Sequence, residues 1–256
     1  MTPVGALIAK ELRGYFVSPV VYVVGAVFLL IFGLLSYLYI VFAGAQAIQL
    51  MQLQGGVAQL NLNDLVFRNL FASVRFVLLI ILPILTMRLF AEERKLRTFE
   101  FLMTSPAGIN EIVAAKFVSV LLVFLGLVGL TGLMPAVLML FSDFDWYPVL
   151  TGYLGLILLG ALFLAVGLLA SALTENQIVA AFLSFGILLV VWLLSGVGSL
   201  LGDTLPGQIV SYLSFMEHYD RLVRGLIDTK DLVYFFSGLA LLLFLTHRIV
   251  ETARWK

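Results

Sequence analysis

Two adjacent glutamates, Glu92 and Glu93, are the first candidates for chemistry in this 256-residue sequence. Together with Arg97 they read Glu-Glu-x-x-x-Arg. A pair of carboxylates can activate a water molecule when one of them acts as a general base. The spacing therefore raises hydrolysis as one hypothesis.

This pattern resembles the glutamate intramembrane proteases related to the CAAX-processing enzymes. That resemblance implies a histidine four residues after a phenylalanine, and a later histidine followed four residues on by asparagine or aspartate. Here Phe215 lies three residues before His218, and His247 is followed by Glu251. The two glutamates also fall in a charged stretch between apolar segments. These departures weigh against proteolysis, which stays as an alternative hypothesis.

Other chemistry finds little support in the residue types. The chain has no cysteine and two histidines, and His218 with Glu217 and Asp220 could make only a weak metal site. Residues 194–198 resemble the signature motif of ABC ATPases, but the sequence holds no G-x-x-x-x-G-K-[ST] for phosphate binding. We therefore expect no catalytic residue, no bound metal and no cofactor on this chain.

The composition is that of a membrane protein. Hydrophobic residues make up 62% of the chain and charged residues 12%, against about 45–50% and about 25% in soluble proteins. The formal net charge is zero, so no overall field attracts nucleic acid. The excess apolar surface needs the lipid bilayer as its solvent.

Apolar stretches of about 20 residues predict transmembrane helices. The predicted fold is all-α, a single polytopic membrane domain over 1–256 with six spans at about 20–42, 70–90, 112–140, 150–173, 178–201 and 232–250. Pro83 and Pro135 are expected to kink the second and third spans. Glycines such as Gly126 and Gly129 are interpreted as helix-packing positions.

Lysine and arginine predict the orientation. Ten of these residues fall on the side that holds both termini and the 91–111 loop, and five fall on the other side. Cytoplasmic loops carry the excess of basic residues. We therefore expect both termini in the cytoplasm.

Three segments outside the spans have patterns of their own. Residues 3–16 place apolar side chains on one helical face, which predicts an amphipathic helix in the membrane interface. Glu11 falls within that apolar arc, where a lone charge is costly, so we expect a basic partner from residues 88–97. Residues 43–69 are expected to form a polar outer loop. Residues 202–231 are too apolar for a plain loop and are expected to re-enter the outer edge of the membrane as short helices.

Residues 91–105 are predicted to form one cytoplasmic helix. Glu93 and Arg97 would make a favourable pair one turn apart. An apolar face adjoins a polar face made of Glu93, Arg97, Glu100 and Thr104. A helix lying flat on the membrane with a solvated face would give the same pattern. Between the fourth and fifth spans, Thr174 and Gln177 fit a capping box.

These segments together resemble the ABC-2 type permeases, most closely the gliding-motility (GldF-like) branch, over essentially the whole chain. The residues that carry the resemblance are Lys10 to Leu12, Tyr15 to Val23, Glu92 to Arg94 with Thr98, Glu100 and Pro106, Ser171 to Gln177, and Phe215 with His218, Gly225, Asp231 and Tyr234. One departure is Arg97, where the family usually has glycine.

The resemblance implies the permease subunit of an ATP-driven exporter in the bacterial inner membrane. Two copies, or two homologous permeases, would pair with two cytoplasmic ABC ATPase subunits that bind ATP and Mg, and an auxiliary membrane subunit is also implied. The 91–105 helix would be the coupling helix. The coupling-helix residues implied to contact the ATPase are Glu92, Glu93, Arg94, Arg97, Thr98, Glu100 and Thr104. Lys10 and Glu11 of the interfacial helix would brace this helix, and Thr174, Asn176 and Gln177 would make secondary contacts with the ATPase. His218 and Asp220 would belong to an outer gate. A complex that transmits motion without moving a substrate is the alternative.

Overall fold

The structure is a computed structural model of the 256-residue chain. It describes residues 3–54, 63–100, 107–142, 144–201, 204–205, 207–208, 212 and 214–253. All elements in this described part are helical. They are α1 (Pro3–Val17), α2 (Pro19–Gln54), the π-helical η1 (Asn63–Arg68), α3 (Asn69–Thr86), α4 (Ala91–Lys95), α6 (Ile109–Thr131), α7 (Leu133–Leu138), α8 (Trp146–Leu173), α9 (Gln177–Leu201), α11 (Phe215–Val223) and α12 (Thr229–Ala253).

Six runs of helix in the described residues are long and apolar enough to cross a membrane, which confirms the predicted all-α, six-span architecture. Their bounds are Pro19–Gln49, Asn63–Lys95, Ile109–Leu138, Trp146–Leu173, Gln177–Val197 and Thr229–Thr252. Helices suit this environment because each satisfies its own backbone hydrogen bonds without water.

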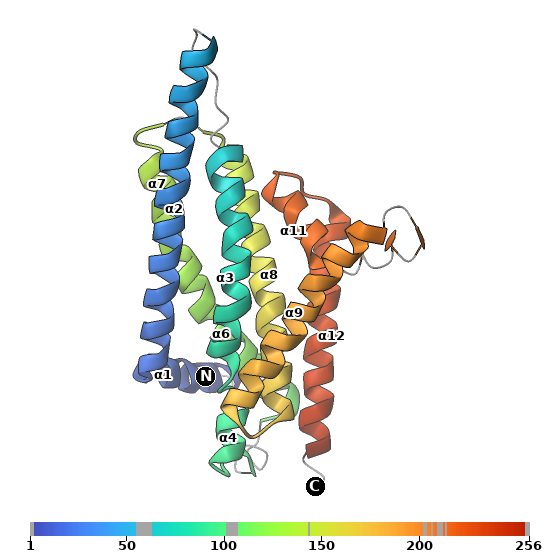
Figure 1. Ribbon diagram of the computed structural model, residues 1–256. Coiled ribbons are helices and arrows are strands. Elements are labelled where there is room, and N and C mark those ends of the chain that lie inside the picture. The colour runs from blue at the N-terminus through green and yellow to red at the C-terminus, as the bar shows by residue number, and fades with distance from the viewer. Residues whose placement is uncertain are drawn as a thin grey trace.

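The spans run along one another, and α1 lies across one end of the bundle (Figure 1). The same end of the bundle holds the last turns of α12 and the short helix α4 (Figure 1). The helix α11 lies toward the opposite end (Figure 1). We call these the α4 end and the α11 end of the bundle.

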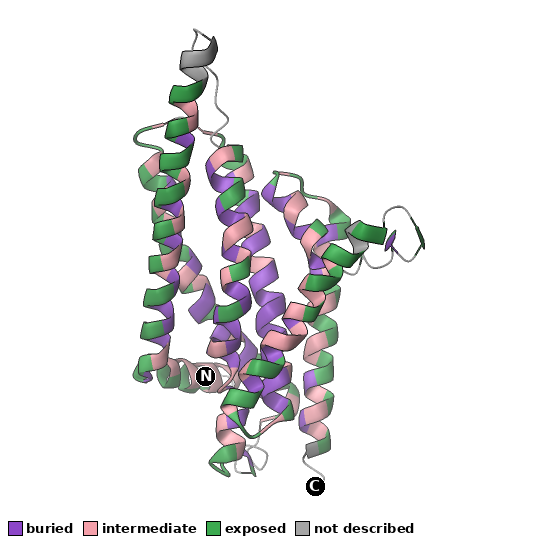
Figure 2. Ribbon diagram, in the orientation of Figure 1, coloured by how far each residue is buried: buried purple, intermediate pink, exposed green. Residues whose placement is uncertain are grey.

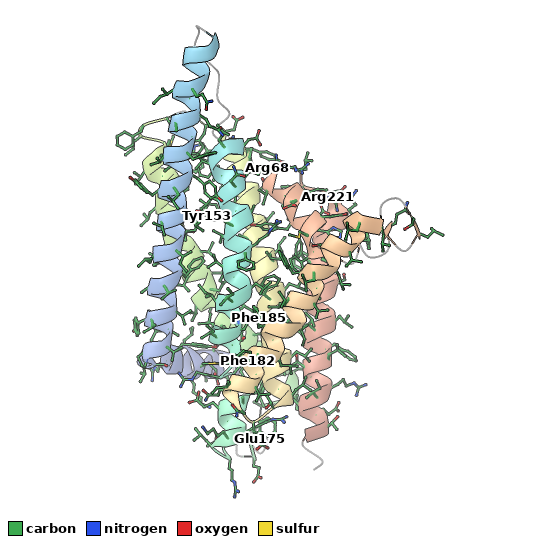
Figure 3. The ribbon with its side chains drawn as sticks, in the orientation of Figure 1. Arg68, Tyr153, Glu175, Phe182, Phe185 and Arg221 are labelled. Atoms are coloured by element: carbon green, nitrogen blue, oxygen red, sulfur yellow. The ribbon has the colours of Figure 1, made fainter. Side chains whose placement is uncertain are left out.

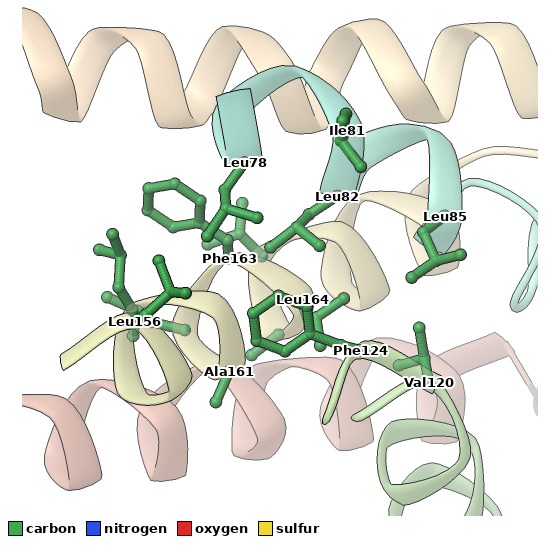
Figure 4. Close-up of a cluster of buried hydrophobic side chains, with 14 of the residues drawn as sticks. Leu78, Ile81, Leu82, Leu85, Val120, Phe124, Leu156, Ala161, Phe163 and Leu164 are labelled. Atoms are coloured by element: carbon green, nitrogen blue, oxygen red, sulfur yellow. The ribbon is translucent and has the colours of Figure 1, made fainter. Parts of the chain in front are cut away.

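The helix α8 forms the centre of the bundle. It packs against α3, α6, α9, α11 and α12, and it is the most buried of the six spans. Leucine, valine and phenylalanine side chains from α3 and α6 meet those of α8 in one apolar cluster (Figure 4). By contrast, α2 exposes apolar side chains along its outer side, as Figure 2 shows. These surfaces fit a bilayer, where an apolar side chain needs no burial in protein.

Close helix contacts occur at glycines of α8 rather than at the glycines expected from the sequence. A Cβ atom added to Gly167 would lie 1.9 Å from Thr86 Oγ1, and one added to Gly160 would lie 2.2 Å from Phe124 Cε1. At Gly126 and Gly129 an added Cβ would meet nothing within 4 Å. The prediction that these two glycines pack helices within the chain was therefore wrong.

One further expectation from the sequence needs correction. Residues 43–54 do not belong to a polar loop, because α2 continues through them to Gln54. In the third span, which runs from Ile109 to Leu138, a short break separates two helices just before Pro135. The helix α6 ends at Thr131 and α7 begins at Leu133, because Pro135 has no N–H to donate to the carbonyl of Thr131.

Candidate functional site

The amphipathic helix α1 is attached to the rest of the α4 end by polar contacts. The Tyr15 hydroxyl donates to the carbonyl of Leu85 at 3.2 Å, and the Ser119 hydroxyl lies 3.4 Å from the carbonyl of Ile8. Burial raises the pKa of the Tyr15 hydroxyl, so it stays protonated as a donor. Lys10 and Arg13 lie on the exposed side of this helix.

A buried lysine joins α1, α4 and α6. The Lys116 side chain is 2% exposed, and its Nζ lies 3.1 Å from Glu11 Oε1 and 2.9 Å from Glu93 Oε1. Lys10 Nζ lies 3.9 Å from the same Glu93 oxygen. The Lys116 ammonium also lies 5.2 Å from the centre of the Phe90 ring. One ammonium therefore bridges two carboxylates from two other helices, and Lys10 is a second cation beside Glu93.

This cluster corrects two predictions. The partner of Glu11 is Lys116 of α6, not a basic residue from 88–97. The Glu93 carboxylate points inward to Lys116 instead of toward a soluble partner, and its side chain is 16% exposed. Glu93 therefore anchors α4 to the bundle.

The start of α4 is held by α8. Ser171 Oγ accepts hydrogen bonds from the backbone N–H groups of Phe90 and Ala91, at 2.9 and 3.1 Å, and donates to the carbonyl of Met87 at 3.1 Å. The first N–H groups of a helix lack partners within it. One serine thus fixes where α4 begins.

A second ion pair lies beside this start. Arg88 donates to both carboxylate oxygens of Glu92, at 2.7 and 2.9 Å, and to the hydroxyl of Ser18 at the turn between α1 and α2. Both pairs line a cavity of about 400 Å³. Glu92 and Glu93 are therefore each engaged by a different cation.

The predicted continuous helix over 91–105 is broken. The helix α4 ends at Lys95, and Arg97 has a φ of +56°. The Thr98 N–H donates to the carbonyl of Glu93 at 3.0 Å, and the Arg97 N–H donates to that of Arg94 at 3.1 Å. This is a Schellman motif, whose left-handed position favours glycine. Helical geometry resumes at Phe99 and Glu100, and Thr104 lies outside the described residues.

Beyond the break, a polar groove of about 790 Å³ separates α4 from the turn between α8 and α9. It is lined by Arg94, Lys95, Arg97, Phe99, Glu100, Glu175 and Asn176. Lys95, Arg97 and Glu100 are exposed, as is Thr98 beside them. Figure 3 shows Glu175 at this end of the bundle. We call this feature the α4 groove.

The turn that forms the far side of the α4 groove is capped differently from the prediction. Asn176 Oδ1 accepts from the N–H of Ile178 at 2.9 Å, and Thr174 Oγ1 accepts from the N–H of Asn176 at 3.1 Å. Asn176, not Thr174, is therefore the N-cap of α9. Gln177 is the first residue of that helix and is half-buried.

His218 belongs to a separate cluster at the α11 end. The imidazole is 1% exposed, and its Nδ1 lies 2.6 Å from Asp231 Oδ1. Its Nε2 lies 3.1 Å from the carbonyl of Tyr212, and its ring stacks on Tyr234 at 4.0 Å. Arg221 also binds Asp231 through Nε at 3.0 Å. Figure 3 shows Arg221 at this end.

Asp220 points away from that histidine. Its carboxylate lies 2.6 Å from Arg75 Nη1 of α3, so the weak metal site suggested by the sequence is not assembled. Within the described residues, no three histidine, cysteine or acidic side chains are grouped to hold a metal ion. The arrangement ties α11 to α3 and α12.

The comparison with family models decides the broader identity. Residues 6–250 match the model described as ABC-2 family transporter protein. The chain belongs to the ABC-2 transporter family. A comparison with curated proteins gave no significant match.

In this ABC-2 family member, the sequence did not predict the contacts of several side chains that hold the helices together. Lys116 and Arg75 were counted only as basic residues of the two sides, and Ser171 was named only among the residues that carry the family resemblance. A lysine inside an apolar span was the available signal for the first, because such a charge needs a partner. The partners of Ser171 and Arg75 lie 80 or more residues away in sequence, where local periodicity carries no information.

The geometry of this ABC-2 protein also bears on the paired glutamates. Glu92 is held by Arg88 and Glu93 by Lys116. His218 lies at the other end of the bundle in its own cluster, and His247 lies 3.9 Å from Glu251. Carboxylates held in ion pairs with separate cations are poorly placed to share one water molecule as general base and acid.

Proposed function

We propose that this chain is the permease subunit of an ATP-driven ABC-2 exporter, and that the α4 groove receives a separate ATPase subunit. The family supports the permease role. The observation that carries the coupling proposal is the construction of α4, which is fixed to the bundle on its inner side and presents exposed charges on its outer side.

The inner side of α4 supplies rigidity. Glu93 is bound to Lys116, and the first N–H groups are bound to Ser171. The connected helices α6 and α8 are both spans of the membrane domain. A displacement applied to α4 would therefore pass to two spans rather than dissipate in a loop.

The outer side of α4 supplies recognition. The α4 groove presents three cations and two carboxylates over a polar surface, and Lys95 and Arg97 are both exposed. Charged groups at an interface fix register and partner choice. The groove is therefore suited to a soluble protein surface with an acidic patch.

The proposed orientation places the α4 end in the cytoplasm. Of the ten basic residues assigned to this side, Lys10, Arg13, Arg88, Arg94, Lys95, Arg97, Lys116 and Arg248 are in the described residues. The other side has five, at Arg68, Arg75, Arg221, Arg224 and Lys230. The excess supports an orientation with both termini inside the cell, and the bacterial inner membrane is the proposed location. A second permease copy or homologue, and an auxiliary subunit, complete the proposed complex.

A charge reversal tests the coupling proposal. The double variant Lys95→Glu with Arg97→Glu alters exposed side chains and leaves the Lys116 cluster intact. We expect the variant to insert and melt like the wild type, but to lose the co-purifying ATPase subunit and its permease-dependent ATP hydrolysis. Lys230→Glu, at the other end, is the matched control. Unchanged co-purification and hydrolysis in the double variant would show that the α4 groove is only a solvated surface.

A further inference from the structure

A second groove lies on the other side of Arg94, where α4 meets the ends of α8 and α12. It has a volume of about 380 Å³, and its lining includes Arg94, Leu173, Leu245, Arg248 and Thr252. Two guanidinium groups thus stand over apolar walls. This combination differs from the α4 groove, whose lining is dominated by polar and charged side chains.

Arg94 brings unused hydrogen-bonding capacity to this groove. Its Nε and Nη2 atoms are buried and have no hydrogen-bond partner among the residues that the structure describes. The guanidinium lies 5.0 Å from the centre of the Phe99 ring, and the Glu175 carboxylate attracts it. A fork of Nε and Nη2 matches two oxygens of a phosphate group, and because both atoms are buried the Arg94 side chain must turn toward the groove to bind one.

Arg248 supplies the second cation from α12. Its side chain is 63% exposed, its Nη1 donates to Glu251 at 3.0 Å, and its guanidinium lies 5.4 Å from the centre of the Phe244 ring. An exposed ion pair of this kind contributes little. Most donors of this guanidinium therefore remain available to an anion in the groove.

An exposed apolar track leads from the groove along the membrane-spanning part of α12. Leu241, Phe244 and Leu245 are 58%, 54% and 40% exposed. They precede Arg248 by seven, four and three residues, so all four share one helix face. A molecule with its anionic group at Arg248 would find apolar surface along this face.

We propose that this groove binds the phosphate headgroup of an anionic phospholipid, whose acyl chain lies along Leu241, Phe244 and Leu245. Arg94 and Arg248 hold the phosphate from opposite walls. Basic pockets between spans at the cytoplasmic surface suit such headgroups. Because Arg94 also lines the α4 groove, a bound lipid would fix the side chain that separates the two grooves. The inference does not require the proposed coupling to an ATPase.

The test counts lipids that stay bound to the purified full-length chain. The protein is exchanged in detergent against equal amounts of phosphatidylglycerol and phosphatidylcholine, and native mass spectrometry counts each lipid retained. We expect the wild type to prefer phosphatidylglycerol. Arg248→Gln should reduce that preference about fivefold, since a basic residue contributes about 1 kcal/mol to anionic-lipid binding. Arg248→Lys should keep part of it, and Arg224→Gln at the α11 end should keep all of it.

Three outcomes would overturn the proposal. One is equal preference in Arg248→Gln and Arg224→Gln. Another is competition by soluble glycerol phosphate at the concentration of the lipid, which would indicate a free-anion site. The third is loss of a co-purifying soluble protein from Arg248→Gln with the lipid preference intact, which would assign the groove to a protein partner. A failure of ATPase coupling in the Lys95 and Arg97 double variant would leave the lipid result unaffected.

Discussion

Replacing Lys116 with methionine should destabilise the protein more than replacing either carboxylate that it binds. The substitution preserves an apolar chain of similar length but removes the ammonium that lies 3.1 Å from Glu11 and 2.9 Å from Glu93. Two carboxylates that are 15% and 16% exposed would then lie close together with only Lys10, 3.9 Å from Glu93, nearby.

The magnitude follows from that geometry. Removing one partner of a buried ion pair costs about 3–5 kcal/mol. The cluster lines an open cavity that lets water reach the carboxylates, so we expect the lower end, about 3 kcal/mol. Glu93→Gln should cost less, because Lys116 would keep Glu11 as its counterion. The triple variant Glu11→Gln, Glu93→Gln, Lys116→Met removes every stranded charge and should recover much of the loss.

The assay is the free energy of unfolding in mixed micelles, measured by denaturant titration. Lys230→Met is the matched control, because Lys230 makes a surface pair with Asp228 at 2.9 Å and its side chain is 52% exposed. Exposed pairs contribute about 0–1 kcal/mol. The reasoning fails if Lys116→Met costs no more than Lys230→Met. It also fails if the triple variant loses as much free energy of unfolding as the three single variants lose in sum.

Three further predictions, on five variants, test other parts of the structure by the same titration. Arg97→Gly should raise the free energy of unfolding by about 0.5–1 kcal/mol. Glycine removes the strain of a left-handed backbone at φ +56°, and this gain exceeds the extra entropy that glycine gives to the unfolded chain. A destabilised variant would contradict the Schellman geometry. Gly167→Ala should lower the free energy of unfolding by about 1–3 kcal/mol, because its Cβ would overlap the Thr86 side chain of α3. Gly126→Ala, where the added Cβ meets open space, should leave the stability unchanged. Equal effects of the two changes would refute the packing at Gly167. Asp231→Asn should cost about 3 kcal/mol, because Asp231 is fully buried between the Arg221 guanidinium and the His218 ring. Asp220 pairs with Arg75 and its side chain is 41% exposed, so Asp220→Asn should cost under about 1 kcal/mol. A larger loss of stability from Asp220→Asn than from Asp231→Asn would contradict the buried cluster around Asp231.

The number and type of helices could be predicted from the sequence because apolar length alone specifies a membrane span. The amphipathic pattern of residues 3–16 likewise marks the side of α1 that packs on α6. Span ends were harder to place, as at α2, which continues to Gln54. Polar residues such as Gln46 and Gln49 can extend a helix beyond the apolar stretch, so composition does not mark where the helix stops.

The contacts within the candidate site could be predicted from the sequence only in part. A helical wheel pairs Glu93 with Arg97, but the left-handed backbone at Arg97 ends that helix first. The preference of the family for glycine at this position was the sequence signal that pointed to such a turn. The actual partner, Lys116, comes from another helix. Such long-range pairs depend on how helices pack, which the local pattern does not encode.

The most direct test of the central claim is site-specific crosslinking between the α4 groove and the ATPase subunit. The chain has no cysteine, so Arg97→Cys and Glu175→Cys each introduce one reactive thiol on opposite sides of the groove. A short heterobifunctional reagent in native membranes should join both variants to a protein that binds ATP, while Lys230→Cys at the α11 end should give no such product. Crosslinking from Lys230→Cys alone, or from none of the three in membranes where the ATPase is active, would contradict the account.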